Sequence, residues 1–150
     1  MAVLITPYTD INATMRGIRR QVCDSLNFCA SDLPVYDNPE QMFNNLKTMI
    51  TYKNDPEGVE LLQSVPTLLT SNYWGRSGYG DCDCFSILAL SMFCVHHWDK
   101  KRIVLAGRSK LAPSHIWVMV NYKGKWYDFD LTQPYFNTRR KYKFIQYLDC

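Results

Sequence analysis

The chain has 150 residues, of which 47% are apolar, 14% aromatic and 21% charged. This composition is typical of a folded globular protein and excludes the disordered class, and the length suits a single domain, 1–150. Seventeen basic residues against fourteen acidic ones give a net charge of only +3, so charge does not indicate a nucleic-acid partner. No apolar run approaches the ~20 residues of a membrane span.

The first 65 residues predict mainly helices. Apolar residues recur at steps of three and four from Ile11 to Leu26, which predicts an amphipathic helix capped by Asp10. A second helix is expected from Asn38-Pro39 to near Asn54-Asp55-Pro56, and a shorter helical segment over 59–62 before Pro66. A loop rich in glycine and aromatic residues is expected over 71–80.

The second half changes from helix to strand. Residues 85–95 are almost all apolar without alternation, so a central helix over about 82–97 is expected to be surrounded by core. Short β-branched and aromatic runs then predict strands, and Lys123-Gly124 is typical of a hairpin turn. These runs cover 103–106, 115–122, 126–131 and 142–148. The expected fold is therefore α+β, with a helical first half and the central helix packed on an antiparallel sheet formed by the second half.

Six cysteines lie at positions 23, 29, 82, 84, 94 and 150. Their spacing is not that of a disulfide framework, and the start of the chain, which breaks at Pro7, does not read as a signal peptide. We therefore expect reduced thiols in a soluble protein made in a cytoplasm.

Cys82 stands at the predicted start of the central helix. The partial positive charge and free N–H groups at a helix start favour a thiolate and can hold an oxyanion. Gly80 allows a close approach of the chain and Asp81 is a candidate N-cap. Because Asp81 and Asp83 flank the thiol and raise its pKa, a nucleophilic Cys82 needs a histidine partner.

His115 is the histidine that fits this role. His96 and His97 close the same predicted helix, roughly 20 Å from Cys82. His115 instead opens a strand of the adjoining sheet. Asp128 and Asp130 are two residues apart on the next predicted strand, so either could orient the imidazole.

Taken together, three blocks resemble the transglutaminase-like superfamily of papain-type fold. Residues 80–86 (GDCDCFS) look like its G-x-C-x-x-F-A block, in particular the G-D-C-D-D variant of bacterial and phage proteins. Residues 115–120 (HIWVMV) are similar to its H-x-W-V-x-V strand, and 126–132 (WYDFDLT) to W-x-x-x-D-P-T. The resemblance covers 70–135, expected to be the catalytic core, and leaves the first 65 residues unmatched.

The resemblance implies a Cys-His-Asp triad of Cys82 as nucleophile, His115 as base and Asp130 as its orienting residue. It implies a thiol peptidase, amidase or transglutaminase-like hydrolase acting on peptide or isopeptide bonds, without cofactor or metal. It also implies an indole or amide that lines the oxyanion or substrate wall, for which Trp74 and Gln63 are candidates.

Two other hypotheses remain open. Cys82 and Cys84 with Cys94 or His96-His97 could ligate zinc, although a C-x-C pair in one helix lacks the usual knuckle spacing. Alternatively, the chain is a catalytically inactive module that serves as a phage structural or partner-binding protein. The G-D-C-D variant suggests a bacterial virus or prophage, with action on cell-wall peptides or association with the virion as the expected roles.

Overall fold

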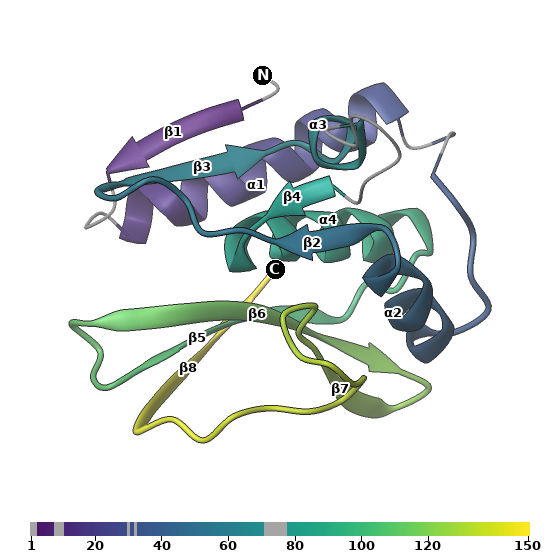
Figure 1. The fold of residues 1–150 in the computed structure, drawn as a ribbon. Coiled ribbons are helices and arrows are strands. Elements are labelled where there is room, and N and C mark those ends of the chain that lie inside the picture. Colours follow the sequence, from purple (N-terminus) through teal and green to yellow (C-terminus); the bar gives the residue numbers. More distant parts are fainter. Residues whose placement is uncertain (1–2, 8–10, 30, 32, 71–77) are drawn as a thin grey trace.

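The computed structural model describes residues 3–7, 11–29, 31, 33–70 and 78–150. Helices and antiparallel sheets combine in an α+β fold, as predicted. Helix α4 lies between a four-stranded sheet on one side and helix α1 with a small two-stranded sheet on the other (Figure 1). In the described part of the chain, no helix has the length and apolar character needed to cross a membrane.

The predicted first helix is confirmed as α1, Ile11–Cys29, while its predicted cap Asp10 lies outside the described residues. The helical segment predicted over 59–62 is wrong. These residues belong to strand β3, Val59–Gln63, which pairs antiparallel with β1, Val3–Pro7. Whether this short run forms a helix or a strand is decided by a partner distant in sequence, because Leu61 lies opposite Ile5 of β1.

Helix α2, Pro39–Lys47, begins as predicted, because the Asn38 side chain accepts a hydrogen bond from the Gln41 N–H at 2.8 Å. It ends before the predicted boundary near residue 54. Residues Ile50–Tyr52 instead form β2, which pairs in parallel with β4, Gly78–Gly80, inside the predicted loop. Helix α3, Val65–Thr70, contains a proline in its first turn, where no N–H is required.

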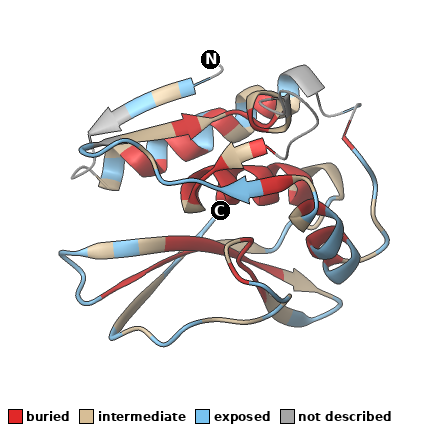
Figure 2. Ribbon diagram, viewed as in Figure 1, coloured by how far each residue is buried: buried red, intermediate tan, exposed pale blue. Residues whose placement is uncertain are grey.

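Helix α4, Cys82–Val95, confirms the predicted central helix, and every residue from Asp83 to Phe93 is buried (Figure 2). It contacts α1 on one face and β6 on the other. The helix ends two residues earlier than predicted, and His97 beyond it takes a left-handed backbone conformation. A helix enclosed in this way fixes the position of its first residue, Cys82.

The four-stranded sheet has the order β7-β6-β5-β8 and is antiparallel throughout. Its strands are β5 Lys101–Gly107, β6 Pro113–Tyr122, β7 Lys125–Phe129 and β8 Phe144–Asp149. The turn between β6 and β7 is the predicted hairpin, since Lys123 and Gly124 both have positive φ, as a primed turn requires. This hairpin sets β7 beside the strand that carries His115.

Candidate active site

Cys82 is the first residue of α4, as predicted, and is partly exposed. Asp81 occupies the N-cap position with an extended backbone, but its side chain makes no capping hydrogen bond, so the predicted capping role is wrong. Its carboxyl group is buried with that of Asp83 instead. The N–H groups of the first turn are therefore left without a cap from this side chain.

His115 lies near the start of β6, opposite Ala106 of β5. Its imidazole stacks on two aromatic rings, with centroid distances of 5.4 Å to Trp117 and 6.0 Å to Tyr142. Both rings lie within 26° of the imidazole plane. This stack limits the rotation of the histidine before any polar contact is considered.

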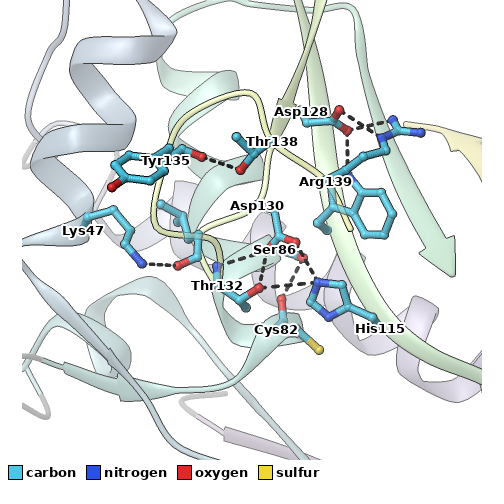
Figure 3. A network of polar contacts seen from close by, with 12 residues as sticks. Lys47, Cys82, Ser86, His115, Asp128, Asp130, Thr132, Tyr135, Thr138 and Arg139 are labelled. Carbon is cyan, nitrogen blue, oxygen red and sulfur yellow. Dashed lines mark hydrogen bonds and ion pairs between the residues drawn. The ribbon is translucent and has the colours of Figure 1, made fainter. Parts of the chain in front are cut away.

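Asp130 follows β7 and holds the other side of the imidazole. The Nε2 atom of His115 lies 2.7 Å from Asp130 Oδ2. The second oxygen, Oδ1, accepts from the Thr132 hydroxyl at 2.7 Å and the Thr132 N–H at 3.0 Å (Figure 3). Asp130 is only 4% exposed, so its carboxylate is fixed by contacts on both oxygens.

Asp128 has a different set of partners. Its carboxylate accepts from the Trp117 indole at 2.8 Å and from two nitrogens of Arg139 at 2.7 and 3.0 Å. These hydrogen bonds raise the pKa of the Arg139 guanidinium above its ordinary value. Of the two carboxylates that the sequence left open, Asp130 is therefore the one that contacts His115.

The side chain of Cys82 lies beside the imidazole of His115 in Figure 3, with no hydrogen bond drawn between the thiol and the ring. The backbone N–H of Ile116, the residue after His115, donates to the thiol and lowers its pKa. Burial raises the pKa of the thiol and is the largest effect, and the charges of Asp81 and Asp83 raise it further. The resulting pKa is well above the ordinary value of a cysteine. The fold thus joins the predicted nucleophile, base and orienting residue in one place, with a thiol that does not ionise by itself.

The carboxyl groups behind Cys82 form a crowded set with one another. Burial, and then hydrogen bonding to Asp81 and Glu60, raises the pKa of Asp83 to about 12. Burial also raises the pKa of Asp55 to about 7, against a hydrogen bond from the Leu61 N–H that lowers it. At neutral pH the Asp83 carboxyl group is therefore protonated, and these carboxyl groups share protons rather than all carrying a negative charge.

A cavity of about 410 Å³ opens beside the imidazole. Its wall is polar, with hydroxyl, amide and guanidinium groups next to His115. The lining residues are Tyr52, Ser114, His115, Thr132, Gln133, Arg140 and Tyr142. A cavity of this size can hold a small chemical group next to His115.

Of the two predicted oxyanion candidates, Gln63 lies among the described residues and is bound away from His115. Gln63 ends β3, and its side-chain amide donates to the Tyr79 carbonyl at 2.8 Å. Trp74 lies outside the described residues. Among the described residues, the N–H groups at the start of α4 are the backbone donors nearest to Cys82 in the sequence.

The zinc hypothesis does not fit the structure. His96 is the C-cap of α4 and stacks on Tyr36, at the opposite end of the helix from Cys82. Among the described residues, the groups of side chains close enough to hold a metal contain Cys84 but not Cys82, Cys94 or either histidine of this pair.

Two residues of the site were not assigned a role from the sequence. Thr132 was part of a recognised block, and a threonine two residues after an aspartate is the available signal, because its hydroxyl and N–H can reach back to the carboxylate. Tyr142 comes from the segment before β8 and gives no such local signal.

Comparisons with protein-family models, with curated proteins and with solved structures find no match to this chain.

Proposed function

We propose that this chain is a cysteine-dependent acyl-transfer enzyme with a papain-like, transglutaminase-like core. The observation that carries the proposal is the contact of 2.7 Å between His115 and Asp130, with the Cys82 side chain beside the same imidazole (Figure 3). The three residues come from a helix start and from the ends of two neighbouring strands. Such an arrangement of nucleophile, base and orienting acid is the requirement for a thiol triad.

The contact also assigns a protonation state to the histidine. A carboxylate accepts, so Nε2 of His115 carries the proton that Asp130 binds, and Nδ1 is left to accept the proton of the Cys82 thiol. The sulfur then attacks the carbonyl carbon of an amide. The carbon–nitrogen bond breaks, the amine leaves with the proton held by His115, and an acyl-enzyme remains for water or a second amine.

The position of the nucleophile supports this chemistry. The N–H groups of the first turn of α4 are free of a side-chain cap and can bind the oxyanion of a tetrahedral intermediate. The cavity beside His115 leaves room for the acyl group. We propose peptide or isopeptide amides as substrates, with cell-wall peptides of a bacterial host as the first class to try.

One observation favours a second candidate, an inactive module that keeps the fold for binding or assembly. The pKa of Cys82 is raised by burial and by Asp81 and Asp83, which opposes formation of a thiolate. In the enzyme, transfer of the proton to His115 overcomes this effect. In an inactive module, the thiol stays protonated and His115 has no influence on it.

Alkylation by iodoacetamide separates the two candidates. Site-resolved mass spectrometry measures the labelling rate of each cysteine, and the enzyme is expected to label fastest at Cys82. His115→Ala should lower that rate by roughly tenfold or more, because the base is lost. His97→Asn is the matched control, since His97 is an exposed histidine at the far end of α4 and Asn tolerates its left-handed backbone. Equal rates in wild type and His115→Ala would reject the enzyme.

Hydrolysis and transfer to an amine require a separate measurement. Purified protein is incubated with peptidoglycan fragments or with a glutamine-containing peptide, with and without a fluorescent primary amine. Released amine without incorporated label identifies a hydrolase, and incorporated label identifies a transferase. Cys82→Ala is the blank for both reactions.

A further inference from the structure

The cavity beside His115 has an arginine in its wall that is available to a ligand. Arg140 lines this cavity together with the imidazole, and its side chain is exposed. Among the described residues, no ion pair and no side-chain hydrogen bond includes its guanidinium. A permanent positive charge therefore stands next to the base of the triad without a partner from the protein.

The arginine that precedes it in the chain has a different environment. The Arg139 guanidinium donates to both oxygens of Asp128, at 2.7 and 3.0 Å, and to the Tyr147 hydroxyl at 2.9 Å. These bonds tie the segment after β7 to strands β7 and β8. Of two adjacent arginines, one is thus engaged in holding the fold and the other is left at the cavity.

The rest of the cavity wall consists of neutral side chains that can form hydrogen bonds. Four carry hydroxyl groups and one carries an amide: Tyr52, Ser114, Thr132, Tyr142 and Gln133. Aspartate and glutamate are absent from the described residues that line it. A guanidinium binds a carboxylate through two parallel N–H···O bonds, and hydroxyl groups can donate to the same oxygens. The wall therefore suits a carboxylate better than a cation.

Tyr142 connects this arginine with the reacting groups. Burial raises the pKa of the Tyr142 phenol, and the charge of Asp130 raises it further, whereas the charge of Arg140 lowers it. A charge on Cys82 also acts on this phenol, whose ring stacks on His115 with a centroid distance of 6.0 Å. Arg140 and the thiol are thus both close to one ring, so a group held by Arg140 lies near the carbonyl that the thiol would attack.

We propose that Arg140 selects substrates whose acyl group carries a free carboxylate. The substrate is then a monoamide of a dicarboxylic acid unit, such as an aspartyl or glutamyl unit. One of its carboxyl groups forms the amide that Cys82 attacks, and the other is free and binds Arg140. This inference rests on the proposed function, because it places the acyl group of that reaction in the cavity. Arg140 is a specificity residue here and takes no part in bond making.

Two alkylating reagents that differ in this charge test the proposal. Iodoacetate has a carboxylate on the carbon that the sulfur attacks, and iodoacetamide has a neutral amide there. The measured quantity is the Cys82 labelling rate with iodoacetate divided by that with iodoacetamide, normalised to the same ratio at the exposed Cys23. Arg140→Gln should lower this quotient about fivefold, as loss of a charged hydrogen bond at an exposed site implies.

Lys141→Gln is the matched control for this substitution. Lys141 is the next residue and is also exposed, and it does not line the cavity. Its replacement removes the same charge from the same segment, so the quotient should stay within about a factor of two of the wild-type value.

Reversible ligands give a second measurement that needs no variant. Glutaramate is the monoamide of a five-carbon dicarboxylic acid, and glutaramide is its neutral diamide. Both are added during iodoacetamide labelling of wild-type protein. Glutaramate should protect Cys82 at a lower concentration than glutaramide does, because its carboxylate can bind Arg140.

The possible results separate this inference from the proposed function. An equal quotient in wild type and Arg140→Gln would overturn the inference, and so would an equal loss in Lys141→Gln or equal protection of the wild type by the two ligands. The proposed function fails instead if His115→Ala leaves iodoacetamide labelling of Cys82 unchanged. Labelling that depends on His115 but not on Arg140 would keep the enzyme and remove its preference for a carboxylate.

Discussion

Replacement of Asp130 by asparagine is expected to harm the site more than removal of the side chain. Both Thr132 donors bind Oδ1 of Asp130, at 2.7 and 3.0 Å. In Asp130→Asn the amide oxygen must therefore stay at the Oδ1 position, and the NH₂ group replaces Oδ2 opposite His115. Two donors cannot share that contact of 2.7 Å. The imidazole is then forced to carry its proton on Nδ1, where it cannot accept the proton of Cys82.

The size of this effect follows from the bond that is lost. A hydrogen bond to a charged group contributes about 1.5–3 kcal/mol, which corresponds to roughly a ten- to hundredfold lower labelling rate of Cys82. In Asp130→Ala the charge is lost as well, but no amide forces the tautomer, so part of the histidine population keeps a free Nδ1. The expected order of labelling rates is wild type, then Asp130→Ala, then Asp130→Asn.

Iodoacetamide labelling of Cys82 measures this order, and long-range ¹H–¹⁵N NMR of His115 reports the tautomer directly. Asp128→Asn is the matched control, because Asp128 binds Trp117 and Arg139 rather than His115. It should lower the urea midpoint and leave the labelling rate within about a factor of two. Our reasoning fails if Asp130→Asn labels as fast as Asp130→Ala, or if its His115 keeps the proton on Nε2.

Three further substitutions test other parts of the structure. Thr132→Val removes the hydroxyl bond to Asp130 and should lower the Cys82 labelling rate about fivefold, the equivalent of ~1 kcal/mol, with the melting temperature almost unchanged. Burial raises the pKa of Asp55 from its ordinary 3.8 to about 7, so folding favours the protonated carboxyl group, and this stabilisation is present below pH 3.8 and is lost between about pH 4 and 7. The free energy of unfolding of the wild type in urea, relative to that of Asp55→Asn, should fall by about 2 kcal/mol over that range. This is half of what the whole pKa shift would give, because the carboxyl group is partly exposed. A difference between the two proteins that does not vary with pH would contradict this. Gly80→Ala places a methyl group 2.9 Å from the Cys84 Cβ and should cost about 1–3 kcal/mol in urea unfolding; no loss would show that the chain before α4 can move aside.

The elements that could be predicted from the sequence are those whose pattern is decided locally. The apolar steps of α1, the continuous apolar run of α4 and the alternation in β6 each specify one kind of element. The run in β3 is too short to separate helix from strand. Its state is decided by β1, more than fifty residues away in sequence, which explains why the helical prediction failed there.

The same distinction separates the two parts of the site. Cys82, His115 and Asp130 lie at the ends of elements that the sequence predicts correctly, so their proximity could be anticipated. Asp55 reaches the start of α4 through the parallel pairing of β2 with β4, and Glu60 through the contact of β3 with α4, neither of which the sequence reveals. Of these carboxyl groups, only the two aspartates beside the thiol were therefore visible in the sequence.

Those two aspartates set the condition under which Cys82 can act. Burial raises the pKa of the Cys82 thiol, and the charges of Asp81 and Asp83 raise it further. The start of a helix alone does not offset these effects, so a nucleophilic Cys82 depends on the transfer of its proton to His115. The sensitivity of Cys82 labelling to His115→Ala and to Asp130→Asn is therefore the measurement that decides between the enzyme and the inactive module.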